Sequence, residues 1–111
     1  MDNIKNNEYF LKKMIVDLEF IVTHTKNLSI DEFKNNEILQ DSVMFRLIQV
    51  SENSDRLKDD FKARHSAIAW RAIKGMRNRI VHDYGEVDIK VVYDTVANDI
   101  PDLLEQLLSL I

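Results

Sequence analysis

An arginine, a histidine and a tyrosine stand at fixed offsets near position 80, and together these side chains can act on a phosphodiester. Arg77 has a permanently charged, forked set of donors that holds and neutralises a phosphate. His82 follows five residues later and carries the side chain best suited to moving a proton near neutral pH. Tyr84 adds a hydroxyl two residues further on. This chemistry requires no metal ion. Apart from Asp83, which should point away from His82, no acidic residue stands at metal-ligand spacing from a histidine, so we expect neither a metal site nor a cofactor.

The segment belongs to a strip of positive charge in an acidic chain. The whole sequence has 15 basic and 19 acidic residues, yet no acidic residue lies between Phe61 and His82. The basic residues of this window are Lys62, Arg64, Arg71, Lys74, Arg77 and Arg79. Such a strip can bind and orient a polyanion while the acidic remainder repels it.

Composition predicts a helical protein. With 111 residues, 45% hydrophobic and 31% charged, and with only two glycines and one proline, the chain fits a single globular helical domain over residues 1–111. The absence of cysteine excludes disulfides and thiolate metal sites, so a reducing cytoplasm is the expected compartment. No apolar run is long enough to cross a bilayer, and we expect no membrane association.

Apolar spacing predicts an all-α fold, an up-down antiparallel bundle of four main helices plus a short extra helix. The first helix is expected over about residues 3–26, followed by the short helix that Ser29 caps and Phe33 anchors. A second long helix is expected from Asn36 or Glu37 to Phe61, with a turn over residues 62–66. The five phenylalanines are expected mainly in the core.

The third helix should carry the reactive segment, with Ser66 as its cap and Gly85 as its end. On a regular helix one arc of about 100° must face the core, and the basic residues and His82 lie outside it. The residues of the core arc are Ala69, Ala72, Ile73, Met76 and Ile80. Gly75 projects no side chain, so a ligand or another helix could approach the backbone there. Asp88 is expected to cap a last helix that Pro101 kinks.

Spacing alone favours a simpler interpretation of the segment. Basic residues often gather in the C-terminal half of a helix because they favour its dipole, and a lone histidine there is usually structural. Short motifs also match by chance. Without further information, a solvated helix face is the better interpretation.

A resemblance to a known family favours the catalytic interpretation over the solvated helix face. Arg77, His82 and Tyr84 resemble the signature of HEPN-domain ribonucleases, in particular the HepT-like toxins, and Asn78 fits the polar residue that often follows the arginine. The resemblance covers about residues 70–107. The family often has a proline just before the tryptophan, where this chain has Ala69 before Trp70, so the start of the third helix is open.

The resemblance implies a HEPN-like homodimer in which the signature helices meet and line one cleft. It implies RNA cleavage in which the ribose 2′-hydroxyl attacks its own phosphate, with His82 assisting proton transfer and Arg77 stabilising the transition state. Asn78 would orient the phosphate or the histidine. Arg71, Lys74 and Arg79 would hold the flanking RNA backbone.

Tyr84 has two interpretations. In the toxins that the chain resembles, a partner nucleotidyltransferase, the antitoxin, uses ATP to attach adenylates to this tyrosine, which would add bulk and negative charge beside Arg77. Without the family, a tyrosine packed at a helix end is favoured.

Two other functions stay open from the sequence. The chain could be a non-catalytic helical partner that binds a nucleotidyltransferase and presents nucleotide or substrate to it. It could also be a purely structural dimerisation bundle, which the segregated charge disfavours.

Overall fold

The computed structural model describes residues 6–81 and 85–111. The helices, in chain order, are α1 (Asn7–Thr25), α2 (Ile30–Lys34), α3 (Glu37–Asp55), α4 (Asp59–Arg64), α5 (Trp70–Lys74), α6 (Met76–Ile80), α7 (Ile89–Asp94), a π-helical turn η2 (Thr95–Asp99) and α8 (Ile100–Leu108). Over these described ranges the only β pairing is an isolated antiparallel bridge between Val81 and Val87. The predicted all-α class is confirmed.

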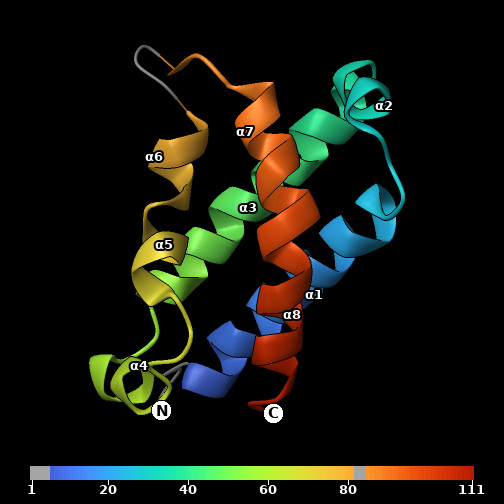
Figure 1. The fold of residues 1–111 in the computed structure, drawn as a ribbon. Coiled ribbons are helices and arrows are strands. Elements are labelled where there is room, and N and C mark those ends of the chain that lie inside the picture. Colours follow the sequence, from blue (N-terminus) through green and yellow to red (C-terminus); the bar gives the residue numbers. More distant parts are fainter. Residues whose placement is uncertain (1–5, 82–84) are drawn as a thin grey trace.

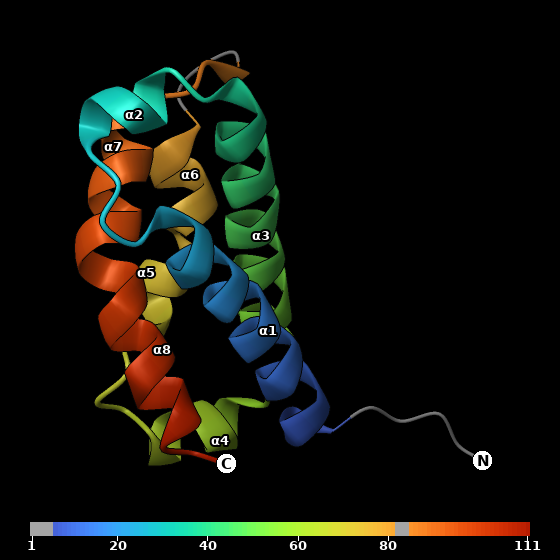
Figure 2. The same ribbon diagram turned by 90° about the vertical axis from the view of Figure 1, so that its right-hand side faces the viewer.

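Four helical arms run up and down the bundle (Figures 1 and 2). They are α1, α3, the pair α5–α6, and the run α7–η2–α8, and the core lies between them. α3 packs along α1 on one side and against α5 and α6 on the other, while α8 packs on α1. None of the helices in the described part of the chain combines the length and apolar character that a membrane crossing requires.

Helix starts follow local capping chemistry. Ser29 and Glu32 form a complete capping box, because the Ser29 hydroxyl accepts from Glu32 N–H and the Glu32 carboxylate accepts from Ser29 N–H. Asn36 accepts from Leu39 N–H at the start of α3, and Asp88 accepts from Val91 N–H at the start of α7. The caps predicted at Ser29 and Asp88 are therefore confirmed, as is the predicted start of the second long helix at Asn36 or Glu37.

The second long helix is shorter than predicted. α3 ends at Asp55, and Leu57 turns into the core with 2% of its surface exposed. Asn7 of α1 accepts a hydrogen bond from Lys58 N–H at 2.9 Å, which fixes the turn, and α4 begins at Asp59. The prediction of one continuous helix to Phe61 is therefore wrong. The prediction of a turn over residues 62–66 is also wrong, since α4 continues to Arg64.

The third helix also differs from its prediction. It begins at Trp70 without a side-chain cap, so Ser66 does not cap it. The indole N–H of Trp70 donates to the carbonyls of Lys62 and His65, at 3.1 and 3.0 Å, and these bonds tie the preceding turn to the helix start. Gly75 divides the helix into α5 and α6.

The described helix ends earlier than expected. α6 ends at Ile80, and Val81 has extended backbone. Gly85, which was predicted to stop the helix, lies in the following loop with φ of 78°. The pairing of Val81 with Val87 ends the helix instead, helped by a hydrogen bond from Asp88 N–H to Ile80 O at 3.2 Å.

The last arm bears an irregularity just before Pro101, where a kink was predicted. Proline has no N–H to continue the helical bonding pattern, and its ring clashes with the carbonyl four residues earlier. The preceding turn, η2, widens into π-helical geometry, with Ile100 N–H bonded to Thr95 O. The irregularity therefore has an identifiable cause.

The phenylalanines divide between core and surface. Phe10 and Phe33 are buried, whereas Phe20 and Phe61 are half-buried. Phe45 is 58% exposed, so its predicted core position is wrong. Phe45 lies on α3 and lines a surface hollow together with Arg46 and with Phe20 of α1.

Candidate functional site

The short pair α5–α6 carries all the candidate residues that the structure describes. Ile73, Met76 and Ile80 are buried and anchor the pair on the core. The candidate residues Arg71, Lys74, Arg77, Asn78 and Arg79 are all exposed. The predicted polar face is therefore confirmed as a solvent-accessible basic strip.

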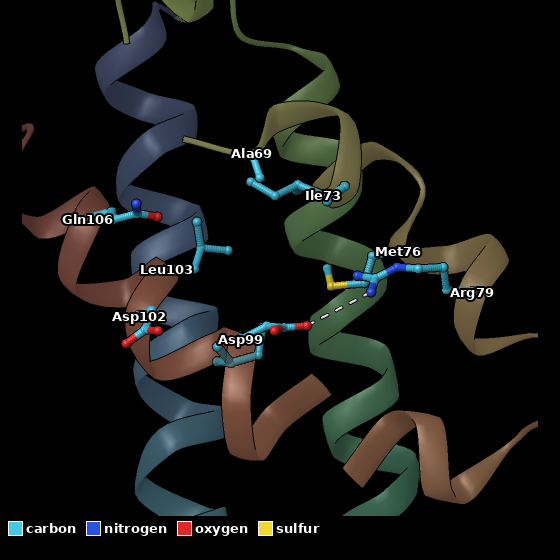
Figure 3. Close-up of a pocket in the computed structure, with 10 residues that line it drawn as sticks. Ala69, Ile73, Met76, Arg79, Asp99, Asp102, Leu103 and Gln106 are labelled. Carbon is cyan, nitrogen blue, oxygen red and sulfur yellow. Dashed lines mark ion pairs between the residues drawn. The ribbon is translucent and has the colours of Figure 1, made fainter. Parts of the chain in front are cut away.

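Arg79 is turned toward the last helical arm. Its guanidinium lies 3.9 Å from the carboxylate of Asp99 in η2, as the dashed line in Figure 3 shows. Both side chains are about half-exposed, so water weakens this ion pair. Arg79 is thus partly neutralised, while among the described residues no ion pair joins Arg71, Lys74 or Arg77 to an acid.

Beside Arg79 the bundle is open. A hollow of about 250 Å³ separates α5–α6 from η2–α8 (Figure 3). Its apolar lining comes from Ala69, Ala72, Ile73, Met76, Ile100 and Leu103, and its polar rim from Arg79, Asp99, Asp102 and Gln106. Ala69 and Ala72 are exposed here, so placing them on the core-facing arc was wrong. The arms separate at this level, and the two alanines are too short to bridge the gap.

Within the described chain, Gly75 has no close neighbour from another helix. A Cβ built at this position meets only the carbonyls of Arg71 and Ala72, at 3.5 and 3.9 Å, which are ordinary contacts. Its φ of −82° is open to any residue. No other helix of the described chain packs closely on Gly75, and this glycine is the point where α5 ends and α6 begins.

His82 and Tyr84 lie outside the described residues. The chain that leads to them is fixed on both sides, since Val81 pairs with Val87 and Asp88 N–H bonds to Ile80 O. The catalytic role of His82 and the modification of Tyr84 remain predictions, as does the pairing of His82 with Arg77.

Local hydrogen bonds shift the pKa values of two groups, Glu32 of α2 and Lys90 of α7. The hydrogen bond from Ser29 N–H, followed by that of the Ser29 hydroxyl, lowers the pKa of Glu32. The hydrogen bond and charge of Asp94 raise the pKa of Lys90. Across residues 6–81 and 85–111, no cluster of three or more His, Asp or Glu side chains has the arrangement to hold a metal ion.

Two contacts of the site were missed by sequence reasoning. Asp99 meets Arg79 from 20 positions away, and Ser51 of α3 donates to the carbonyl of Lys74 from 23 positions away. Neither contact has a local sequence signal. Only a known packing of α3 and η2 around α5–α6 could have revealed them.

Comparison with known proteins identifies the family. The profile of the family described as Ribonuclease HepT-like matches residues 14–110, most of the chain and all of its described basic strip. The chain belongs to the HepT-like ribonuclease family. Membership agrees with the helical bundle and with the exposed Arg77 and Asn78 on α6.

The relatives of this HepT-like chain are named as ribonucleases. The protein named Probable ribonuclease HepT of Thermococcus cleftensis is 30% identical over 99 residues, which cover 89% of this chain and 90% of that protein. A Caldanaerobacter subterraneus protein named as a candidate RNase is 26% identical over 103 residues, covering 93% of this chain and 92% of the relative. Family and names together indicate that the HepT-like chain is a ribonuclease acting on RNA.

One relative is longer. A Methanocaldococcus jannaschii protein, whose name joins a gamma-glutamylcyclotransferase to a candidate RNase, is 28% identical over 106 residues. These cover 96% of the HepT-like chain but 48% of the relative. The search of solved structures gave no significant match.

Proposed function

We propose that this protein is the toxin of a toxin-antitoxin pair, a metal-independent endoribonuclease that uses Arg77 and His82 in a cleft at the interface of a homodimer. The ribose 2′-oxygen forms a bond to the adjacent phosphorus as its proton leaves, and the bond from phosphorus to the 5′-oxygen breaks as that oxygen gains a proton. His82 assists these proton transfers, and Arg77 neutralises charge on the phosphorane-like transition state. The products are a 2′,3′-cyclic phosphate and a 5′-hydroxyl, and the cytoplasm is the compartment in which we expect this activity.

The observation that carries this proposal is the exposed basic strip of α5–α6 in a chain of the HepT-like ribonuclease family. Arg77 and Asn78 are exposed one turn before the end of α6, and His82 follows two residues after that end. Arg71 and Lys74 extend the strip along α5, where they suit contacts to flanking phosphates. Arg79 would add a contact where Asp99 releases it.

A homodimer supplies what a single chain lacks. Cleavage needs one group to accept a proton and another to donate one, and the strip of one chain offers only His82 in the signature. A two-fold axis close to α6 would bring two copies of Arg77 and His82 to one RNA strand. The dimer also doubles the basic surface available to the backbone.

Neutralisation would act through Tyr84. A partner nucleotidyltransferase, the antitoxin, would transfer adenylate from ATP to the tyrosine hydroxyl and release pyrophosphate. Each adenylate brings a phosphodiester with a negative charge into the neighbourhood of Arg77 and competes with RNA for it. Intact mass after co-expression with such a partner tests this step, and Tyr84→Phe should carry no added adenylate.

The decisive experiment is cleavage of total cellular RNA by the purified protein in the presence of a chelator. Arg77→Ala should lower the rate by about 100- to 1,000-fold and His82→Ala by about 100- to 10,000-fold. His24→Ala and Arg56→Ala are matched controls, since they remove the same side-chain types from α1 and from the end of α3. Equal cleavage by the wild type and both strip variants would refute the proposal and favour a non-catalytic partner of the nucleotidyltransferase.

A further inference from the structure

Ser51 is a buried polar residue that reaches from α3 to the segment carrying the candidate site. Its hydroxyl donates to the carbonyl oxygen of Lys74 at 3.2 Å, and only 5% of the residue is exposed. The other buried polar residues of α3 are Asn53 and Ser54. The Asn53 side chain bonds within its own helix, to Gln49 O, so it does not perform the same task.

Ser51 binds a carbonyl at the end of α5, where the helix break removes the regular helical hydrogen-bond partner. α5 ends at Lys74 and α6 begins at Met76, with Gly75 N–H bonded back to Arg71 O and Arg79 N–H bonded to Gly75 O. Gly75 is a turn residue between the two helices, so the regular helical hydrogen-bond pattern is interrupted at Lys74. The last carbonyls of a helix lack an intrahelical partner, and Ser51 supplies one to the Lys74 carbonyl in a part-buried hydrogen bond.

Neither short helix can hold its own position. α5 and α6 have five residues each, too few for a stable isolated helix. Their buried anchors, Ile73 and Met76, resist withdrawal from the core but fix rotation and axial shift poorly, because apolar contacts are not directional. A hydrogen bond at the junction is directional. Its acceptor, the Lys74 carbonyl, lies three residues before Arg77 and four before Asn78.

The presence of a serine at position 51, on the buried face of α3, also requires an explanation. Alanine has a higher helix propensity and buries no polar group, so it would be the simpler choice on the buried face of α3. A buried hydroxyl is tolerated when it is hydrogen-bonded. Here the bond leads to another helix.

From this geometry we infer that Ser51 is a positioning residue for the ribonuclease site, and that it sets the orientation of α6 and therefore of Arg77 and Asn78. The inference rests on the proposed role of Arg77. Ser51 touches no substrate and acts only through the Lys74 carbonyl. Its loss should reduce the rate of the chemical step more than the affinity for RNA, since the exposed basic strip would survive.

The first test does not involve RNA. Hydrogen exchange of the amides of residues 76–81 is measured in the full chain for the wild type, Ser51→Ala and the matched control Ser54→Ala. Ser51→Ala should speed exchange in this segment about fivefold, the value of one net hydrogen bond. Ser54→Ala removes a hydroxyl from the same buried face and should leave the segment unchanged. Equal exchange in wild type and Ser51→Ala would overturn the inference whether or not the protein cleaves RNA.

The second test measures cleavage. Ser51→Ala should lower kcat by about 10- to 100-fold, as expected for a misplaced catalytic group, while KM changes less than about twofold. If exchange rises but kcat per folded molecule stays at the wild-type value, the positioning role is refuted. If the wild type does not cleave RNA at all, the proposed function fails, and the exchange result still decides whether Ser51 orders α6.

A further pair of variants covers the case in which Ser51→Ala does not fold. Ser51→Thr and Ser51→Val have nearly the same shape and differ in the hydroxyl. Threonine should restore slow exchange and kcat relative to valine. Equal exchange rates and equal kcat values for the two variants would show that side-chain volume, and not the hydroxyl, determines the position of α6. That result would overturn the inference.

Discussion

At the residue scale, the basic side chains of the strip are not equivalent. Arg77 is exposed without an acidic partner among the described residues, whereas Arg79 lies 3.9 Å from Asp99. An arginine in a half-exposed ion pair keeps its charge, but it must leave its partner to contact a phosphate. The availability of Arg79 to RNA therefore depends on Asp99.

Asp99→Asn should release Arg79 and strengthen RNA binding. One more phosphate contact would steepen the dependence of log affinity on log salt concentration by about 0.7 for single-stranded RNA. Asp102→Asn is the matched control, because Asp102 lines the same hollow but forms no ion pair with Arg79 in the described structure. Salt titrations of binding to a non-cleavable oligonucleotide measure both slopes. Equal slopes for the two variants would mean that only net charge matters.

The two glycines make opposite demands on the backbone, and this gives a second prediction. Gly75 has φ of −82° and room for a Cβ, so Gly75→Ala should stabilise the fold by about 0.4 to 1 kcal/mol through a less flexible unfolded chain. Gly85 has φ of 78°, so Gly85→Ala should destabilise the fold by about 1 to 2 kcal/mol. Denaturant unfolding measures both changes. A destabilised Gly75→Ala would show that the α5–α6 junction needs glycine.

At the element scale, the helix starts follow from sequence because capping is local. Ser29, Asn36 and Asp88 each bond to a backbone N–H three residues on, and such short spacings can be read directly from a sequence. The helix ends do not follow in this way. α3 ends because Leu57 reaches the core and Lys58 bonds to Asn7, and α6 ends because Val81 pairs with Val87. These are tertiary contacts, which override helix propensity.

The capping box of α2 predicts a response to acid. The pKa of Glu32 is lowered in the folded chain, so its carboxylate contributes to holding α2 at pH values above about 4.3, its unfolded value, and this contribution is lost as pH falls through the lower folded pKa. The amide resonance of Ser29 should therefore shift as pH falls below this unfolded value. Glu32→Gln keeps a capping partner without a titrating group, and its Ser29 amide should not shift. An identical shift in the variant would assign the change to another acid.

The site was predictable only in part for the same reason. The strip from Arg71 to Arg79 is contiguous in sequence, so its charge and its exposed face were foreseen. Its supports come from distant positions, Ser51 on α3 and Asp99 in η2, and no local pattern marks them. The exposure of Ala69 and Ala72 was missed because a regular helix was assumed to lie flat on the core, whereas the arms diverge at this level.

At the scale of the whole molecule, charge is segregated between neighbouring arms. The α5–α6 arm carries the basic strip, and the adjacent η2–α8 arm presents Asp99, Asp102 and Glu105. RNA attracted to the first arm is repelled by the second, so a strand should keep to the side of α6 away from the hollow. Arg77 and the residues that follow α6 would then be the groups it meets.

A shared cleft makes a final prediction about two copies of the chain. If the reacting phosphate is handled by Arg77 of one subunit and His82 of the other, Arg77→Ala and His82→Ala proteins should each be inactive alone and regain activity when mixed and allowed to exchange subunits. Half of the dimers in an equal mixture would be mixed, and each mixed dimer would hold one complete pair, so recovery should approach about a quarter of the wild-type rate. Mixing either variant with a double variant that lacks both groups is the control, since no such dimer contains a complete pair. Recovery of activity in the mixture of Arg77→Ala and His82→Ala would show that the site spans two subunits. No recovery despite demonstrated exchange would mean either that each Arg77 and His82 pair lies within one chain or that one cleavage needs both copies of His82.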